Sequence, residues 1–138
     1  MDALEVSTRL LPKENGGFLQ VSGIRFKVDS LVATPVVMDE NGQFGHVEGN
    51  RRVSNVEILD KEDNEYHAIE PDRTYTIASS TFLVEDYGDN GILRYARVKE
   101  SNLGQDVDML AIYLEQILGG KIGAEYSDIE GRILIKAE

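Results

Sequence analysis

Short segments with alternating apolar and polar residues follow one another along most of this chain, and only one long segment has a helical period. Alternation is typical of strands that bury one face, whereas apolar residues at i, i+3, i+4 and i+7 form one face of a helix. Strands that occur in runs, and not in alternation with helices, argue against a doubly wound parallel sheet. We therefore predict an α+β fold, with a mixed or antiparallel sheet of several short strands, one well-defined helix and a short N-terminal helix.

The expected strands are separated by polar or glycine-containing turns. We place them at residues 18–28, 36–38, 53–59, 66–69, 74–79 and 131–137. In the first of them the apolar positions change parity near Ser22 and Gly23, which predicts a β-bulge at that point. Asn41 and Gly42 predict a turn after the second.

The spacing of apolar residues predicts the well-defined helix at residues 106–118. Its apolar face consists of Leu110, Tyr113, Leu114 and Ile117. We expect Asp106 to cap this helix and Gly119-Gly120 to end it. A shorter helix is expected over residues 1–11, and Pro12 is expected to end it. Its abrupt start is what a chain cut inside a helix would show.

Length and charge limit the class of protein. A chain of 138 residues is expected to form a single domain, residues 1–138. The net charge of −11 opposes binding to DNA, RNA or anionic membranes. The absence of Cys excludes disulfides and thiolate chemistry. No long apolar run is present near the N-terminus, so we expect no membrane insertion, and an export signal would have to precede this chain.

Motifs for metal-dependent or nucleophilic catalysis are missing from the sequence. The two histidines, His46 and His67, lack the spacing of a metal centre. The acidic run at residues 60–64 lacks the pattern of a calcium loop, and no G-x-S-x-G or phosphate-binding glycine motif occurs. We therefore predict no catalytic residue, no metal ligand and no cofactor within this chain.

Phe18 stands on the polar side of its expected strand, next to two glycines. If Leu19 and Val21 face the core, the pleat of a strand directs Phe18 away from it. An outward aromatic ring can stack on a planar ligand, as aromatic residues stack on nucleic-acid bases. A second small core or a buried subunit contact would explain the same placement.

The second candidate is the segment Gly88-Asp89-Asn90-Gly91, which predicts a loop. An aspartate on such a loop can accept hydrogen bonds from ribose hydroxyls. A plain surface turn is the alternative interpretation of these residues.

Several segments, in the same order, resemble the C-terminal domain of the 5′-nucleotidase family, which includes bacterial bifunctional cyclic phosphodiesterase/nucleotidases. They are GGFLQVSGIRFKVD, NRRVSNVEIL, EPDRTYTIASSTFLVEDYGDNG, the DVDMLAIYL helix and EGRI, and they extend from about Leu4 to Ile133. The resemblance implies that this chain is the later portion of such a domain. It also implies that a metallophosphatase domain with two divalent metal ions lies outside the chain, in an extracellular, cell-surface or periplasmic enzyme that removes phosphate from nucleotides.

The resemblance further implies a nucleoside site in which two aromatic rings enclose the base. Phe18 matches the first of them, and Asp89 matches the aspartate of the family's GGDGF or GGDGY block. This chain has YGDNGI there, so the second aromatic position falls on Gly91 or Ile92, and Gly88 keeps the family's glycine.

Two nearby tyrosines, Tyr87 and Tyr95, could replace the second aromatic ring only by moving. This departure leaves open a second hypothesis, a non-catalytic binding or assembly module with a decayed nucleoside site. The chain alone is expected to hydrolyse nothing and to form a homodimer or swapped oligomer, because a partial domain exposes apolar surface.

Overall fold

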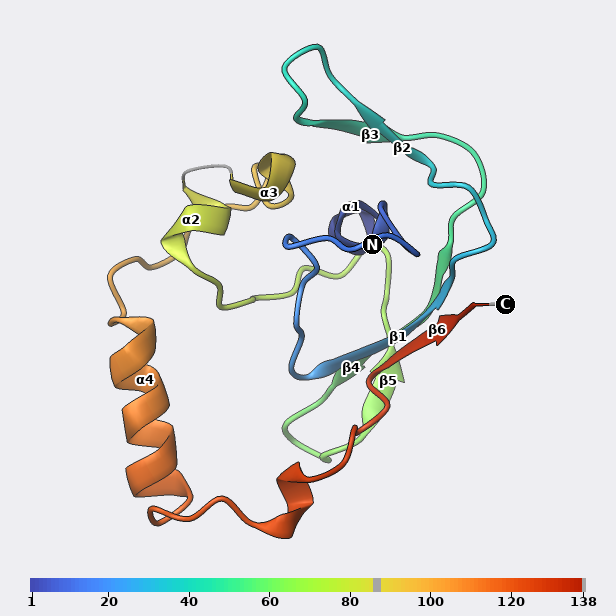
Figure 1. The fold of residues 1–138 in the computed structure, drawn as a ribbon. Coiled ribbons are helices and arrows are strands. Elements are labelled where there is room, and N and C mark those ends of the chain that lie inside the picture. Colours follow the sequence, from blue (N-terminus) through green and yellow to red (C-terminus); the bar gives the residue numbers. More distant parts are fainter. Residues whose placement is uncertain (86–87, 138) are drawn as a thin grey trace. The chain divides into compact units, whose positions relative to one another are not determined.

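The computed structural model of the chain describes residues 1–85 and 88–137 (Figure 1). The chain forms two compact units, one of residues 1–94 and 131–138 and one of residues 95–130. The predicted α+β class, with a mixed sheet of short strands and a few helices, is confirmed. The prediction that residues 1–138 form one domain stays a prediction.

A four-stranded sheet forms the main body of the first unit, in the order β5-β4-β1-β6. Its strands are β1 (Ile24–Asp29), β4 (Val53–Leu59), β5 (Tyr66–Ala68) and β6 (Ile133–Lys136). β4 pairs antiparallel with both β1 and β5, whereas β6 pairs parallel with β1. The sheet is therefore mixed, and the last strand of the chain lies beside the first (Figure 1).

A separate hairpin consists of β2 (Val36–Met38) and β3 (Phe44–Val47), which pair antiparallel. Its turn is closed at Asp39, whose N–H donates to the carbonyl of Gln43 at 2.7 Å. The predicted segment at residues 36–38 and the turn that follows it are confirmed.

The N-terminal helix α1 (Asp2–Thr8) lies between the sheet and the hairpin (Figure 1). Leu4 packs in one core cluster with residues of β1 and β4, namely Phe26, Val28, Val53 and Val56. Val6 packs on the opposite side of the helix in a second cluster with Phe44 and Ile92. Leu4 and Val6 are two residues apart, and side chains two residues apart on a helix point about 200° apart around its axis. A helix with apolar residues on both sides is buried, and residues 4–8 are buried without exception.

The second unit contains the predicted long helix. It consists of α4 (Asp106–Ile112), which continues as a π-helical turn η1 (Tyr113–Ile117), and a short 3₁₀ turn η2 (Ala124–Tyr126) follows. Gly120 donates its N–H to the carbonyl of Leu114 at 2.8 Å, which ends the helix where expected. The expected cap is wrong, because Gln105 is the N-cap residue and Asp106 lies in the first turn.

One strand prediction is also wrong, and the prediction for residues 18–28 holds only in its second half. Residues 18–23 lie outside the sheet, because β1 begins only at Ile24, after Gly23 with a φ of +70°. Residues 74–79, all within the described part of the chain, form no strand. The bulge occurs instead in β4, where Arg25 faces Glu57 and Lys27 faces Ser54, so that β4 carries one extra residue.

Candidate functional site

Helix α1 holds the segment that precedes β1. The Oγ atom of Ser7 accepts a hydrogen bond from the N–H of Leu19 at 2.7 Å. The side-chain amide of Asn15 donates to the carbonyl of Ser7 at 2.8 Å, and its oxygen accepts the N–H of Gly17 at 3.1 Å. Phe18 lies between these anchored residues and is half-buried, and it belongs to neither core cluster. The backbone on both sides of Phe18 is thus fixed to α1, outside any strand.

The same helix holds the second candidate segment, which forms one short helical turn, α3 (Gly88–Gly91), in place of the expected loop. Arg9, the residue that follows α1, donates from its guanidinium to the side-chain oxygen of Asn90. The side-chain nitrogen of Asn90 donates to the carbonyl of Gly42 in the hairpin turn at 2.7 Å. Asn90 adopts a left-handed backbone with a φ of 62°, a conformation that Asn tolerates better than most residues.

One core cluster joins the two candidate segments. Ile92, just after α3, is 6% exposed and packs with Val6 of α1 and Phe44 of β3. Leu19, next to Phe18, packs against the same cluster. The residues next to Phe18 and next to α3 therefore share one small core. Phe18 and α3 themselves are about 70 positions apart along the chain.

The predicted site residues lie in different environments, and the structure does not describe all of their side chains. Ile92 is 6% exposed and packs in the second core cluster. Gly88 and Gly91 are buried at the two ends of α3. The side chain of Asp89 lies outside the described residues, as does Tyr87. Tyr95 belongs to the other unit and is 70% exposed. The assignment of these residues to a ligand stays a prediction.

Both glycines of α3 are tightly surrounded. A Cβ atom on Gly88 would lie 2.3 Å from the ring of Phe82 in the helix α2 (Thr81–Val84). A Cβ atom on Gly91 would lie 2.7 Å from the Oε1 atom of Gln43, and the φ of Gly91 is +68°. A side chain at Gly88 would have to displace the ring of Phe82. One at Gly91 would be strained by the positive φ and would have to displace the end of the Gln43 side chain.

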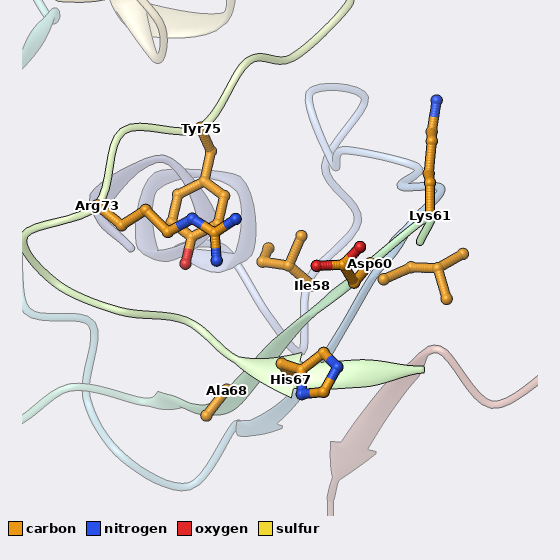
Figure 2. Close-up of a pocket in the computed structure, with 8 residues that line it drawn as sticks. Ile58, Asp60, Lys61, His67, Ala68, Arg73 and Tyr75 are labelled. Carbon is orange, nitrogen blue, oxygen red and sulfur yellow. The ribbon is translucent and has the colours of Figure 1, made fainter. Parts of the chain in front are cut away.

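Sequence reasoning did not find a hollow of about 240 Å³ beside β4 and β5 (Figure 2). Its lining residues are Ile58, Leu59, Asp60, Lys61, His67, Ala68, Arg73 and Tyr75. The guanidinium of Arg73 stacks on the ring of Tyr75 at 5.3 Å and forms an ion pair with Glu70 at 3.1 Å. None of the predicted site residues lines this hollow, and its charged side chains carry no motif that could have revealed it.

An exposed group near the hollow contains Asp63, Glu65 and His67, whose ligand-type atoms lie within 4.8 Å of one another. The Nε2 atom of His67 is 2.7 Å from Asp63, and this hydrogen bond raises the pKa of His67. The backbone N–H of Glu65 and the contact with His67 both lower the pKa of Asp63. Exposed carboxylates commonly pair with a histidine in this way, so the group by itself does not identify a metal centre.

The comparisons with known proteins concern both the sequence and the fold. A family model described as the 5′-nucleotidase, C-terminal domain matches residues 1–105. The chain is similar to the crystal structure of a 5′-nucleotidase precursor from Thermus thermophilus, with a TM-score of 0.71 and 23% sequence identity. That match covers 99% of this chain and 23% of the Thermus chain, so the present chain spans about a quarter of that protein. At this identity the likeness shows the fold alone. No curated protein matches the chain.

Proposed function

The chain belongs to the family of 5′-nucleotidase C-terminal domains, and from that premise we propose that it binds the nucleoside part of a nucleotide. In this proposal a metal-containing domain outside the chain hydrolyses the phosphate ester. The chain positions the substrate and carries no catalytic residue.

The observation that supports this proposal most strongly is the common attachment of two distant segments to α1. Ser7 holds the backbone beside Phe18, and Arg9 holds Asn90 of α3. Both segments lie within the residues that the family model matches. A binding site built from two chain segments needs such a scaffold, because ligand affinity falls when the contacting groups must be ordered on binding.

The proposed roles follow from the residue types. The ring of Phe18 stacks on the base, a contact worth about 1–3 kcal/mol when the base is desolvated. Asp89 accepts hydrogen bonds from the ribose, and Gly88 and Gly91 let α3 pack closely against Phe82 and Gln43 and so hold the turn that carries Asp89. Ile92 serves this site through packing, because its side chain is buried with Val6 and Phe44.

The whole protein is proposed to be a nucleotide-hydrolysing enzyme with two divalent metal ions in its other domain. Its proposed location is extracellular, at the cell surface or periplasmic. Among the described residues, no helix is both long and apolar enough to cross a membrane.

Nucleoside binding is tested on the 138-residue chain by ligand-observed NMR and calorimetry with adenosine. Phe18→Leu keeps apolar volume and removes the flat ring, so we expect it to weaken binding by about tenfold or more. Tyr66→Leu is the matched control, since Tyr66 is another half-buried aromatic of the same unit, on β5. Wild-type chain that binds no adenosine, or equal losses in both variants, would refute the proposal.

A second candidate function is a non-catalytic binding or assembly module. The observation that favours it is the exposed apolar face of the second unit, where Leu110 is 57% and Ile117 is 68% exposed. Contiguous apolar surface of this kind drives association. A chain that associates with itself and binds no adenosine would support this candidate.

A further inference from the structure

The turn of the β2–β3 hairpin is stiffened by one side chain. The Oδ1 atom of Asp39 accepts the N–H of Asn41 at 3.0 Å and the N–H of Gln43 at 2.8 Å. These two bonds and the neighbouring guanidinium of Arg94 keep Asp39 ionised, and the N–H of Gln43 is the largest cause of its lowered pKa. A turn whose backbone groups are fixed in this way can serve as a firm support for a neighbouring segment.

Three contacts attach residues 90–94 to this turn. Asn90 donates to the carbonyl of Gly42, as described above. Arg94 forms an ion pair with the second carboxylate oxygen of Asp39 at 3.4 Å. Gly91 lies close to the side chain of Gln43, since a Cβ atom on Gly91 would be 2.7 Å from its Oε1 atom. The hairpin turn and the end of α3 thus meet at several points, although they are about 50 residues apart along the chain.

Asn90 is the residue common to all the elements involved. Its oxygen accepts from Arg9 beside α1, and its nitrogen donates to the hairpin. An amide side chain has a donor and an acceptor, so it can join two partners that each supply only the complementary group. A carboxylate at this position keeps the acceptor and loses the donor.

We propose that the β2–β3 hairpin positions α3 for the nucleoside, with Asn90 as the positioning residue that fastens the two together. This inference rests on the proposed function, in which α3 contacts the ligand. The hairpin itself touches no ligand in this scheme. It stabilises the conformation of α3 before binding, which removes an ordering cost that the ligand would otherwise have to offset.

The test uses Asn90→Asp, which keeps the shape and the tolerance for a left-handed backbone. The new carboxylate faces the carbonyl of Gly42 and cannot donate to it. Asn64→Asp is the matched control, because Asn64 also has a positive φ, of 59°, and the change adds the same charge elsewhere in the first unit. Asn90→Gly, which removes both side-chain bonds and tolerates the positive φ, is the second variant.

Amide hydrogen exchange measures directly how firmly the hairpin turn and α3 are attached. We expect the amides of residues 39–43 and 88–94 to exchange roughly 2- to 10-fold faster in Asn90→Asp, the effect of losing about one hydrogen bond. They should exchange at least as fast in Asn90→Gly, which loses both side-chain bonds. Asn64→Asp should leave these amides unchanged. If these amides exchange in Asn90→Asp at the same rates as in the wild type, the proposed attachment is overturned.

Adenosine binding then tests the positioning role. We expect the dissociation constant to rise roughly 2- to 10-fold in Asn90→Asp and to stay constant in Asn64→Asp. Faster exchange without a change in affinity would show that the attachment does not serve the ligand, and would overturn the positioning role. A wild-type chain that fails to bind adenosine would refute the proposed function and this role with it, whereas the exchange result would still decide on the attachment.

Discussion

The carboxylate of Glu5 accepts a hydrogen bond from the backbone N–H of Val53 at 3.1 Å, and the side chain of Glu5 is fully buried. The N–H of Arg52 donates to the same carboxylate at 3.4 Å, and the guanidinium of Arg52 donates in return to the carbonyl of Thr8 at 3.0 Å. Helix α1 and the start of β4 therefore bind each other through groups of both partners. Since α1 also holds the candidate site, this reciprocal attachment connects the site to the main sheet.

We expect Glu5→Ala to lower the free energy of unfolding by at least about 2 kcal/mol, because it leaves buried backbone N–H groups without an acceptor. Glu62→Ala removes the same charge from an exposed position and should change the free energy by less than about 0.5 kcal/mol. Urea denaturation followed by circular dichroism measures both. Similar midpoints for Glu5→Ala and the wild type would contradict this view of α1.

Gly91 is predicted to tolerate no side chain. Gly91→Ala introduces a Cβ atom 2.7 Å from Gln43 at a backbone φ of +68°. We expect a loss of about 1–2 kcal/mol, the usual penalty for a non-glycine residue in the left-handed region. Gly16→Ala is the control, because a Cβ atom there meets nothing within 4 Å and its φ is not positive. Thermal melts that shift equally for the two variants would refute the prediction.

Local sequence patterns predicted those helices and turns that are determined by residues close together in the sequence. The helix beginning at Asp106 follows from its apolar spacing, and the turn at Asn41 follows from residue types that favour turns. The segment around Phe18 did not follow, because the N–H of Leu19 donates to the side chain of Ser7 in α1, and β1 begins only at Ile24. Alternation was present there, but a strand also needs a partner, and the pattern of one segment does not show whether a partner exists.

The candidate site shows the same division between local and distant causes. The family motif drew attention to Phe18 and to the glycines of α3, and the family itself is confirmed. The motif could not show that Ile92 is core, because its neighbours Val6 and Phe44 are far away in the sequence. The roles of Arg9 and Asn90 were missed for the same reason, since an arginine after a helix and an asparagine in a turn are individually ordinary.

Substitutions of Ile92 separate a core position from a ligand contact. Ile92→Phe adds volume to a packed cluster, so we expect a loss of about 1–3 kcal/mol. Ile92→Val should cost about 0.5–1.5 kcal/mol and leave adenosine affinity unchanged. Chemical denaturation and calorimetry on the same samples measure both quantities. A tighter complex with adenosine in Ile92→Phe, without loss of stability, would place this residue in the ligand site instead.

His67 is predicted to titrate at a raised pKa because Asp63 accepts its hydrogen bond. The folded state then favours the charged imidazole, so this contribution to stability is present below the ordinary value of about 6.5 and is lost as the pH rises through the folded pKa. Asp63→Asn should lower the pKa of His67, and Glu62→Gln, which removes a neighbouring charge without this contact, should lower it less. An NMR titration of the His67 ring protons measures these values, and equal shifts in the two variants would assign the effect to net charge.

Self-association through the second unit is the remaining prediction. Leu110, Tyr113 and Ile117 are at least 42% exposed and lie on one face of α4 and η1. Burial of such side chains against another copy would gain about 25 cal/mol per Å² of apolar surface, so we expect dimers or larger oligomers at high protein concentration. Leu110→Glu should shift the population towards monomers, because it places a charge in the contact, whereas Leu31→Glu introduces the same charge at a residue of similar exposure, 57%, in the first unit and should not. Light scattering over a range of concentrations measures the mass, and a monomeric wild type at the highest concentration would contradict the prediction.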